Sequence, residues 1–234
     1  MPTAMTPTRE LRDRPAYHLS DAAAYVRLPV ATLRSWVSVR ESRSRHASKP
    51  VRPLIVPADP RNGILSFNNL VEAHMLREFR RTHQVQLDAV RKALDYASEH
   101  LSIARPLLSR RLLTDGAHVF VEQLGALVNL SASGQIYFRS VMEAQLHHVA
   151  WDDRDLAYRL YPEISGVGRS DAAPIVAIDP ALSFGRAFVL RRGIATHVIV
   201  QRIDAGESPD ELAEDYGLTA AEVAAAVAFE TQAA

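Results

Sequence analysis

The sequence predicts an α+β fold that consists mainly of helices. Apolar residues recur at helical spacing through most of the chain, and two pairs of such segments are separated by only a few residues. Strand candidates are short apolar runs beside turn signals. The chain has 234 residues, of which 47% are hydrophobic and 23% charged, so it suits one large or two small globular domains.

Composition excludes several classes of protein. The chain has no cysteine, which rules out a disulfide scaffold, a thiol nucleophile and a thiolate zinc site. No run approaches the roughly 20 apolar residues of a membrane span, and the first 18 residues lack the apolar core of a secretory signal. We therefore expect a cytoplasmic protein without membrane contact.

The formal net charge of zero conceals two oppositely charged halves. Residues 1–111 carry 19 basic and 10 acidic side chains, whereas residues 112–234 carry 8 basic and 17 acidic ones. Of the basic residues 25 are Arg and two are Lys, and Arg suits bidentate contacts with phosphates and base edges. The first half is therefore the part suited to a polyanion, and the second half should be repelled by one.

The N-terminal part predicts a helix-turn-helix after a flexible arm at residues 1–15, which contain three prolines. Ser20 is the expected N-cap of a first helix, and Pro29 fits the first turn of a second helix. The apolar faces of these two helices consist of Ala22, Ala23 and Val26, then of Val30, Leu33 and Trp36. About three residues join the helices, which is the spacing of a helix-turn-helix.

A basic loop and a hairpin should follow. Residues 38–53 are rich in Ser and Arg and favour a loop, while 54–56 and 64–67 are strand candidates around an Asn-Gly turn signal. Asn68 or Asn69 should then cap a helix from about Leu70 to Thr82, followed by a helix with apolar positions from Leu87 to Ala97. Together, residues 16–105 form the first expected domain.

The centre of the chain predicts a small β unit followed by a helix, within residues 106–160. Apolar runs beside Gly and Ser suggest antiparallel strands over 107–138. A helix is expected over 139–160, with the acidic run 152–155 as part of it. Residues 161–174 contain two Gly and two Pro and form the best linker candidate.

The C-terminal region, residues 175–234, predicts a small helical domain with a short strand. Residues 175–178 suggest a strand, 184–193 an extended segment, and Thr196 the cap of a helix that Gly206 ends. Two capping boxes, Ser208 to Glu211 and Thr219 to Glu222, open two further helices around Gly217. These last helices form a second helix-turn-helix pattern.

The run Thr32-Leu33-Arg34-Ser35-Trp36 resembles the recognition helix of MerR-like regulators. Segments around Leu65–Leu70, Leu76–Arg77 and Val90–Leu94 are similar to the wing and post-wing helices of that family, so the resemblance covers about residues 17–97. Arg27 stands where the family usually has a turn glycine. The resemblance implies a winged helix that binds operator DNA as a homodimer. The expected DNA-contacting residues are Arg27, Thr32, Arg34, Ser35, Arg40, Arg43 and Arg45.

The run Ala205-Gly-Glu-Ser-Pro209, with the Asp179-Pro180 turn before it, is similar to a small C-terminal domain of antitoxins. A MerR-like head with this tail looks like a long VapB-type antitoxin of a toxin–antitoxin pair. That resemblance implies an autorepressor that also neutralises a PIN-like ribonuclease toxin. Arginines that pair with the carboxylates of such a nuclease are the expected contacts. The candidates are Arg186, Arg191 and Arg192, and the equally weighted alternative is an internal ion pair with Asp179 or Glu207.

Enzyme motifs are weak, and we expect no catalytic residue, metal or cofactor. Gly166-Val-Gly168 lacks the third glycine of a dinucleotide fingerprint. Glu143 with His147, and His74 with Glu78, have helical spacing but lack a third metal ligand. Two other functions stay open: a stand-alone MerR-like regulator whose residues 107–234 bind a ligand, and an interaction scaffold that does not bind DNA.

Overall fold

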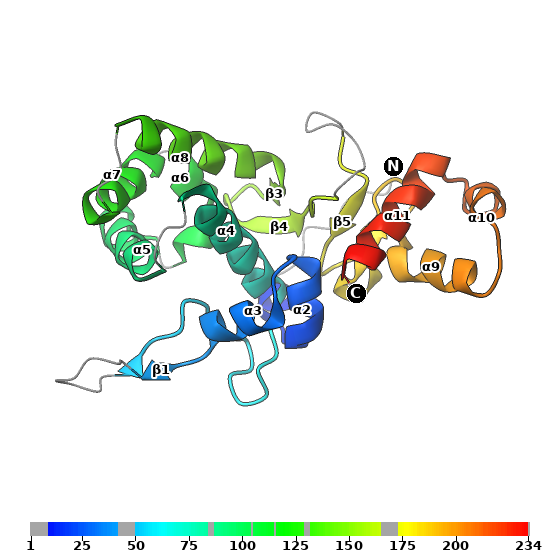
Figure 1. The fold of residues 1–234 in the computed structure, drawn as a ribbon, viewed down its shortest axis with the longest axis horizontal. Coiled ribbons are helices and arrows are strands. Elements are labelled where there is room, and N and C mark those ends of the chain that lie inside the picture. The colour runs from blue at the N-terminus through cyan, green and yellow to red at the C-terminus, as the bar shows by residue number, and fades with distance from the viewer. Residues whose placement is uncertain are drawn as a thin grey trace.

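The fold is α+β and mainly helical, as the computed structural model shows (Figure 1). It describes residues 9–41, 50–83, 87–103, 105–114, 116–128, 132–164 and 173–233. The helices are α1 Arg9–Asp13, α2 Leu19–Tyr25, α3 Val30–Val37, α4 Phe67–His83, α5 Leu87–Leu101, α6 Arg110–Leu113, α7 Ala117–Val128, α8 Ala132–Ala144, α9 Thr196–Asp204, α10 Pro209–Tyr216 and α11 Ala220–Ala233. Single 3-10 turns lie at η1 Pro106–Leu108, η2 Gln145–His147 and η3 Ser183–Gly185.

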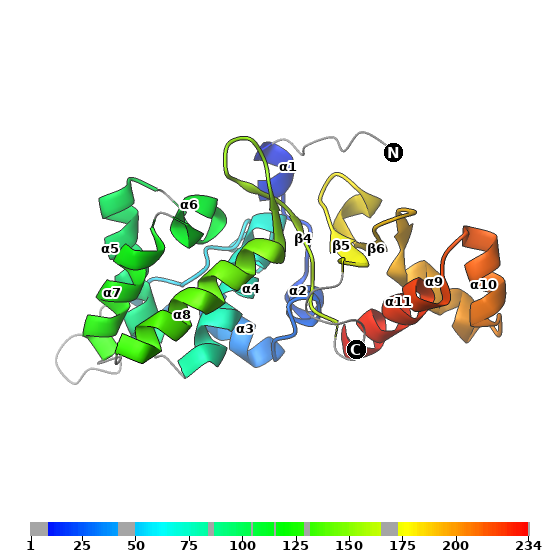
Figure 2. The same cartoon turned by 90° about the horizontal axis from the view of Figure 1, so that it is seen from above.

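Two antiparallel sheets complete the fold. A hairpin pairs β1 Arg40–Glu41 with β2 Pro50–Val51. A second sheet has five strands in sequential order: β3 Val149–Trp151, β4 Ala157–Leu160, β5 Val176–Ile178, β6 Ala187–Val189 and β7 Ile194–Ala195. Figures 1 and 2 show this sheet between the helical group α4–α8 and the C-terminal helices α9–α11.

The described residues of 107–138 form η1, α6, α7 and the first half of α8, so the expected β unit there is wrong. The apolar residues of α7 fall at helical spacing, and Phe120 packs against Phe79 of α4 and Phe138 of α8, with ring centroids 5.3 and 5.9 Å apart. All three rings are fully buried. Burial of one face of α7 in this aromatic cluster outweighs the local strand preference of its Val and Phe residues.

The helix expected over 139–160 ends at Ala144, and η2, β3, a turn and β4 occupy the rest of that range. The acidic run 152–155 is the turn between these strands. Asp152 Oδ1 accepts hydrogen bonds from the backbone N–H groups of Arg154 and Leu156, both at 2.9 Å. This turn chemistry competes with a helix, because an Asp side chain satisfies backbone donors locally. The expected linker 161–174 is described only at 161–164 and 173–174.

Residues 9–15 are docked on the protein, contrary to the expected flexible arm, whose residues 1–8 lie outside the described part. Arg12 in α1 is buried and forms an ion pair with Asp152 at 2.7 Å. The neighbouring Asp13 pairs with Arg105 at 2.7 Å and accepts a hydrogen bond from Asn68. Ionic contacts with two distant parts of the chain therefore fix α1.

Helix α4 begins at Phe67, three residues before the expected start. Ser66 Oγ accepts from the Asn69 N–H at 3.2 Å, and Asn69 Oδ1 accepts from the Ser66 N–H at 3.1 Å. This reciprocal pair has the geometry of a capping box with Asn69 in the third helical position. Asn68 and Asn69 therefore lie inside the helix rather than at its cap.

The C-terminal helices begin largely as the sequence predicts. Both capping boxes form: Ser208 with Glu211, and Thr219 with Glu222. Gly217 ends α10 in the left-handed conformation, with φ +60°. A second core lies beneath these helices, formed by Val189, Ile199, Leu212, Leu218, Val223 and Ala226.

Two expectations in the C-terminal region need correction. Of the expected extended segment 184–193, residues 187–189 form a strand, while η3 and a turn occupy the rest and β7 follows at residues 194–195. Thr196 is the first residue of α9 and is buried, with Ala195 at the N-cap. Its hydroxyl donates to the Ala187 carbonyl at 3.2 Å instead of capping the helix, because β6 lies directly alongside.

Candidate nucleic-acid interface

Helices α2 and α3 form the expected helix-turn-helix, and an arginine occupies its turn. The Leu28 N–H donates to the Ala23 carbonyl at 2.9 Å, and the Arg27 N–H donates to the Ala24 carbonyl at 3.1 Å. These two bonds are the Schellman motif, which ends a helix with one left-handed residue. Arg27 has φ +51°, so a non-glycine residue adopts the conformation that usually favours glycine.

The start of α2 differs slightly from the expectation. His18 is the N-cap, and Ser20 lies in the first turn, where its hydroxyl donates to Asp21 Oδ1 at 3.1 Å. The expected cap at Ser20 is therefore wrong. The register shifts by two residues because Tyr17, directly before the cap, forms a bridge with Leu65 that fixes the chain entering the helix.

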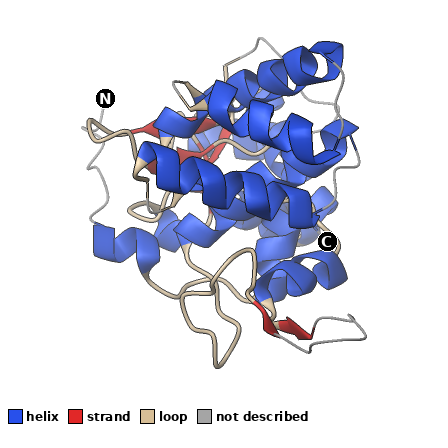
Figure 3. Ribbon diagram, turned by 90° about the vertical axis from the view of Figure 1, so that its left-hand side faces the viewer, coloured by secondary structure: helices blue, strands red, loops and turns tan. Residues whose placement is uncertain are grey.

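The expected hairpin over 54–67 is not a two-stranded sheet. Residues 54–56 and 64–67 are not strands, because the Leu54 and Ile55 N–H groups donate to the Trp36 carbonyl at 2.8 and 3.1 Å. Across the expected Asn-Gly turn, the pairing is one isolated antiparallel bridge, in which Asp59 and Ile64 exchange backbone N–H···O bonds of 3.0 and 3.1 Å. A different hairpin, β1–β2, lies earlier in the chain, and Figure 3 shows it extending beyond the helices at one end of the molecule.

The predicted DNA-contacting residues of α3 are on its outer side. Leu33 and Trp36 are fully buried, whereas Arg34 between them in sequence is exposed. Thr32 and Ser35 are half-buried, and Ser35 Oγ donates to the Thr32 carbonyl at 2.6 Å. Of these three predicted contacts on α3, Arg34 is therefore the one whose side chain is exposed to solvent.

The other predicted arginines are placed differently. Arg27 is half-buried, and burial together with the charge of Arg77 lowers the pKa of its guanidinium, while Glu163 raises it. Its surroundings are thus internal rather than those of a groove-reading side chain. Arg40 begins β1, and Arg43 and Arg45 lie outside the described residues.

Two arginines that the sequence reasoning did not single out extend the basic surface. Arg52 follows β2 directly and its side chain is 84% exposed. Arg61 is exposed in the loop 59–64, where Asp59 accepts hydrogen bonds from the Arg61 and Asn62 N–H groups at 3.0 and 3.1 Å. The Asp-Pro-Arg-Asn-Gly run was the available signal, because it builds a rigid turn around one arginine.

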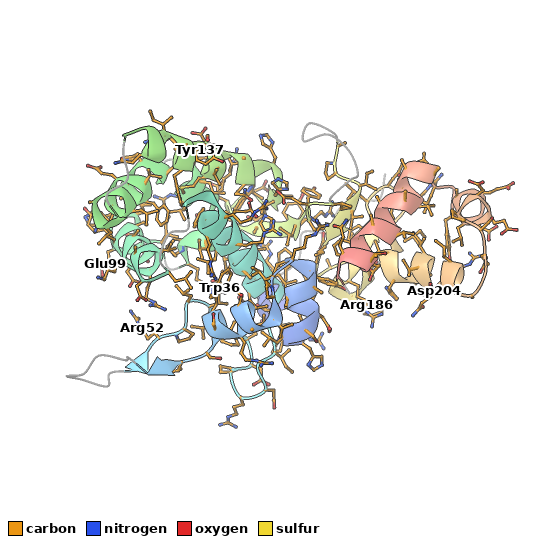
Figure 4. All side chains as sticks on the ribbon, viewed as in Figure 1. Trp36, Arg52, Glu99, Tyr137, Arg186 and Asp204 are labelled. Carbon is orange, nitrogen blue, oxygen red and sulfur yellow. The ribbon has the colours of Figure 1, made fainter. Side chains whose placement is uncertain are left out.

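These groups share one side of the molecule. In Figure 1, α3, the hairpin and the loop after it lie on the lower side, while α7 and α8 lie at the top. Figure 4 places Arg52 and Arg186 on this lower side as well, with α2 and α3 between them. The resulting surface offers a helix, a hairpin and several arginines to one partner.

The three C-terminal arginines have intramolecular contacts. Arg191 donates to both carboxylate oxygens of Glu222, at 2.8 and 2.6 Å, and to the Gly217 carbonyl at 2.7 Å. Arg192 donates to the same carbonyl at 3.2 Å. Both thus supply positive charge at the C-terminal end of α10, where free carbonyls favour it. Arg186 contacts His197 Nε2 at 3.0 Å and stays exposed.

An internal ion pair was the expected alternative for these arginines, but its partners differ. Asp179 pairs with Arg159 at 2.8 Å, and Glu207 pairs with Arg202. Arg191 pairs with Glu222 instead. The carboxylates named from the sequence are therefore occupied by arginines from β4 and α9.

The described residues contain no group of three or more His, Asp or Glu side chains arranged to hold a metal ion. His74 of α4 is buried and contacts Gln145 Oε1 at 3.0 Å rather than a carboxylate. Within the described ranges, no helix has the length and apolar character needed to cross a bilayer.

One family model matches the C-terminal region, and one solved structure matches the fold over almost the whole chain. A family described as "Protein of unknown function (DUF433)" matches residues 176–229. A crystal structure of Rv2018 from Mycobacterium tuberculosis superposes with a TM-score of 0.65 at 24% identity, covering 92% of this chain and 97% of that one. The two chains share a fold.

Two curated proteins of Mycobacterium tuberculosis are similar along almost the whole chain. One carries the name "Putative antitoxin VapB45" and is 29% identical over 228 residues, covering 90% of this chain and 92% of the relative. The other is "Uncharacterized protein Rv2308", 24% identical over 225 residues, covering 93% of this chain and 90% of the relative.

Proposed function

We propose that this chain is an antitoxin that binds operator DNA as a homodimer and neutralises a ribonuclease toxin of the PIN-like class. The observation that carries the proposal is the exposed α3 with Arg34 on its outer side, next to the β1–β2 hairpin and the arginines around it. The name of the VapB45 relative, which matches this chain over 90% of its length, supports the antitoxin part.

The physical case for DNA rests on charge and shape. Phosphate neutralisation by Arg and Lys provides affinity without sequence information. A helix that enters the major groove reads base edges, and Arg forms bidentate bonds with guanine. Arg34 has the position for base contact, while Arg52 and Arg61 have positions for phosphates. Arg40 begins β1, and Arg43 and Arg45 follow it in the sequence before β2, so we assign all three to the same phosphate contacts.

The case for a toxin rests on the C-terminal domain. Acidic residues dominate its surface and would repel DNA. Arg186 and Arg192 are exposed and suit the carboxylates of a metal-dependent nuclease. Arg191 is the weakest of the three candidates, because it already holds Glu222 with two hydrogen bonds.

A gel-shift titration with the DNA upstream of the gene tests the DNA part. We expect Arg34→Ala to weaken operator binding about 10- to 100-fold, the usual cost of losing one bidentate base contact. Arg139→Ala is the matched control, since Arg139 is an exposed arginine of α8, on the opposite side of the molecule. Equal affinities of the Arg34→Ala variant and the parent would reject α3 as the recognition helix.

Coexpression with the neighbouring gene tests the toxin part. A toxin should copurify with the full chain, and Arg186→Glu with Arg192→Glu should abolish copurification without changing operator binding. A pair that remains intact would remove these arginines from the interface. Failure of any neighbouring product to copurify would reject the antitoxin role.

A stand-alone regulator is the second candidate, and a cavity of about 570 Å³ favours it. The cavity lies between residues 52–58, α4, α5 and η1, and its charged lining residues include Glu72, Arg91 and Arg105. It lies in the N-terminal half, not in the expected ligand region 107–234. A small molecule that changes operator affinity, with no toxin partner, would favour this candidate over the antitoxin.

A further inference from the structure

The outer side of α3 carries an apolar side chain near Arg34. The sequence pattern places Val30 with Leu33 and Trp36 on the apolar face of this helix, but the structure separates them. Leu33 and Trp36 are fully buried, whereas Val30 is 37% exposed. Val30 also belongs to neither of the two hydrophobic clusters found among the described residues. A valine at the start of the proposed recognition helix is therefore available to a partner.

Val30 and Arg34 share one face of α3. They are four residues apart in a continuous helix, so their side chains lie one helical turn apart, with about 5–6 Å between their Cβ atoms. Ala31, three residues before Arg34, is exposed as well. This face therefore presents an apolar patch at the N-terminal end of α3 and one guanidinium a turn further along.

The other polar side chains of α3 add little to this face. Ser35 Oγ donates to the Thr32 carbonyl at 2.6 Å, and both residues are half-buried. The helix contains no acidic residue, so no carboxylate on it repels a phosphate or accepts a hydrogen bond from a base amino group. The bases that α3 can distinguish therefore depend mainly on Val30 and Arg34.

The surroundings of α3 favour DNA as the molecule that covers this face. In Figure 1, the β1–β2 hairpin and the loop 59–64 both extend below α3. Arg52 directly after the hairpin and Arg61 in the loop are exposed, and Figure 4 places Arg52 on the same side. Cationic groups on both projections complement the phosphates that border a DNA groove. This charge complementarity selects DNA over a protein segment as the occupant.

We propose that α3 reads a thymine and a guanine that lie one or two base pairs apart in each operator half-site. Val30 contacts the C5-methyl group of the thymine, and Arg34 donates to O6 and N7 of the guanine. The spacing follows from the helix, because about 5–6 Å between the Cβ atoms covers one to two of the ~3.4 Å steps between bases. The proposal rests on the operator binding of the proposed function and adds the bases that α3 recognises.

The chemistry of Val30 selects thymine among the four bases. Its side chain neither donates nor accepts a hydrogen bond, so packing it on a base amino group or on O6, N7 or O4 would leave that polar group without a partner. The apolar group that a base pair presents in the major groove is the C5-methyl of thymine. Contact between this methyl group and Val30 removes apolar surface from water on both molecules and leaves no donor or acceptor unpaired.

Gel shifts of the full chain on modified operator DNA test the thymine contact. In each duplex of the upstream DNA, one thymine is replaced by deoxyuridine, which removes only the C5-methyl group. We expect one such replacement per half-site to weaken binding about 3- to 5-fold, the effect of losing one buried methyl group. The same replacement should not affect the Val30→Ala variant. Ile136→Ala is the matched control, since Ile136 is an exposed aliphatic residue of α8, and it should respond like the parent.

Replacement of single guanines by 7-deazaguanine removes N7 and locates the partner of Arg34. We expect a sensitive guanine one or two base pairs from the sensitive thymine, and no such sensitivity in the Arg34→Ala variant. The proposal would be overturned if no thymine responded to deoxyuridine, if Val30→Ala responded like the parent, or if the two bases lay further apart. A Val30→Ala variant that loses the toxin but binds the operator normally would also overturn it.

The same gel shifts distinguish this proposal from the proposed function. Weak operator binding by the Arg34→Ala variant, together with no response to deoxyuridine, keeps α3 as the recognition helix and rejects the thymine contact alone. Failure of the parent to bind the upstream DNA would reject both.

Discussion

Arg77 of α4 donates from Nη1 to the carbonyl of Val26, 2.9 Å away in the turn of the helix-turn-helix. Its Nη2 lies 3.2 Å from Glu163 Oε2, just after β4. One buried guanidinium of α4 therefore links the turn between α2 and α3 to the residues that follow β4. The Val26 carbonyl is one of the orphan acceptors at the end of α2, so Arg77 also satisfies a helix terminus.

Arg77→Met should destabilise the protein by about 3–5 kcal/mol, the usual effect of removing one partner from a buried ion pair. The substitution leaves Glu78 buried without its nearest cation. Arg81→Met is the matched control, since Arg81 faces Glu78 and Glu163 from the surface, and it should cost less than about 1 kcal/mol. Urea unfolding measures both; equal losses would contradict the role given to Arg77.

Arg52→Ala and Arg61→Ala should each reduce the salt dependence of operator binding. If each arginine neutralises one phosphate, the slope of log K against log salt concentration becomes shallower by about 0.9 per substitution. Fluorescence anisotropy between 50 and 200 mM salt gives the slope. Arg154→Ala, on the exposed β3–β4 turn, should leave it unchanged. An unaltered slope in both variants would place the phosphate contacts elsewhere.

Glu222 should contribute stability that acid removes. The hydrogen bonds from Arg191, and then those from Thr219, lower the pKa of this carboxyl from 4.5 to about 2. A lowered pKa in the folded state stabilises above pH 4.5, and this contribution is lost as the pH falls from 4.5 toward 2. Glu222→Gln should therefore have a lower urea midpoint at pH 7 and a flatter acid dependence.

The control for Glu222 is Glu214→Gln, which changes an exposed carboxylate of α10. This variant should keep the acid dependence of the parent. The same slope in the Glu222→Gln variant and the parent would show that the Arg191–Glu222 pair does not set the acid response.

His74 should make the protein sensitive to mild acid. Burial is the main cause that lowers its pKa well below 6.5, and the charges of Arg77 and His148 add to it. Below pH 6.5 the unfolded chain takes up a proton that the folded His74 does not, so stability falls by up to about 1.4 kcal/mol for each pH unit. His74→Phe should reduce this slope between pH 6.5 and 5, whereas His118→Phe, at an exposed position of α7, should not. A parent whose stability is flat over this range would contradict the prediction.

Local signals predicted the C-terminal capping boxes and the turn between α2 and α3 well. Ser208, Glu211, Thr219 and Glu222 form their capping boxes because each bond joins groups only three residues apart. Arg27 was recognised as standing where a turn usually has glycine, and it does adopt a left-handed conformation. The exposed position of Arg34 likewise follows from the spacing of Leu33 and Trp36 on one short helix.

Long-range packing decided the centre. Nothing near Phe120 in sequence shows that Phe79 and Phe138 enclose it, so a helix was taken for strands. The acidic run after Trp151 was taken for a helix because its long-range partner Arg12 lies 140 residues away from Asp152. Buried polar residues of α4 such as Asn69 and Glu72 also depend on distant partners that no periodicity shows.

The sequence by itself determined the helix-turn-helix, the capped C-terminal helices and the division into a basic and an acidic half. These features depend on neighbours within one or two helical turns or on simple charge counts. Tertiary structure alone decided which arginines are exposed, that Arg191 is bound to Glu222, and that Phe184 is exposed on a left-handed turn. Exposure and pairing depend on which distant segments meet, because burial and ion pairs are properties of contacts across the fold rather than of spacing along the chain.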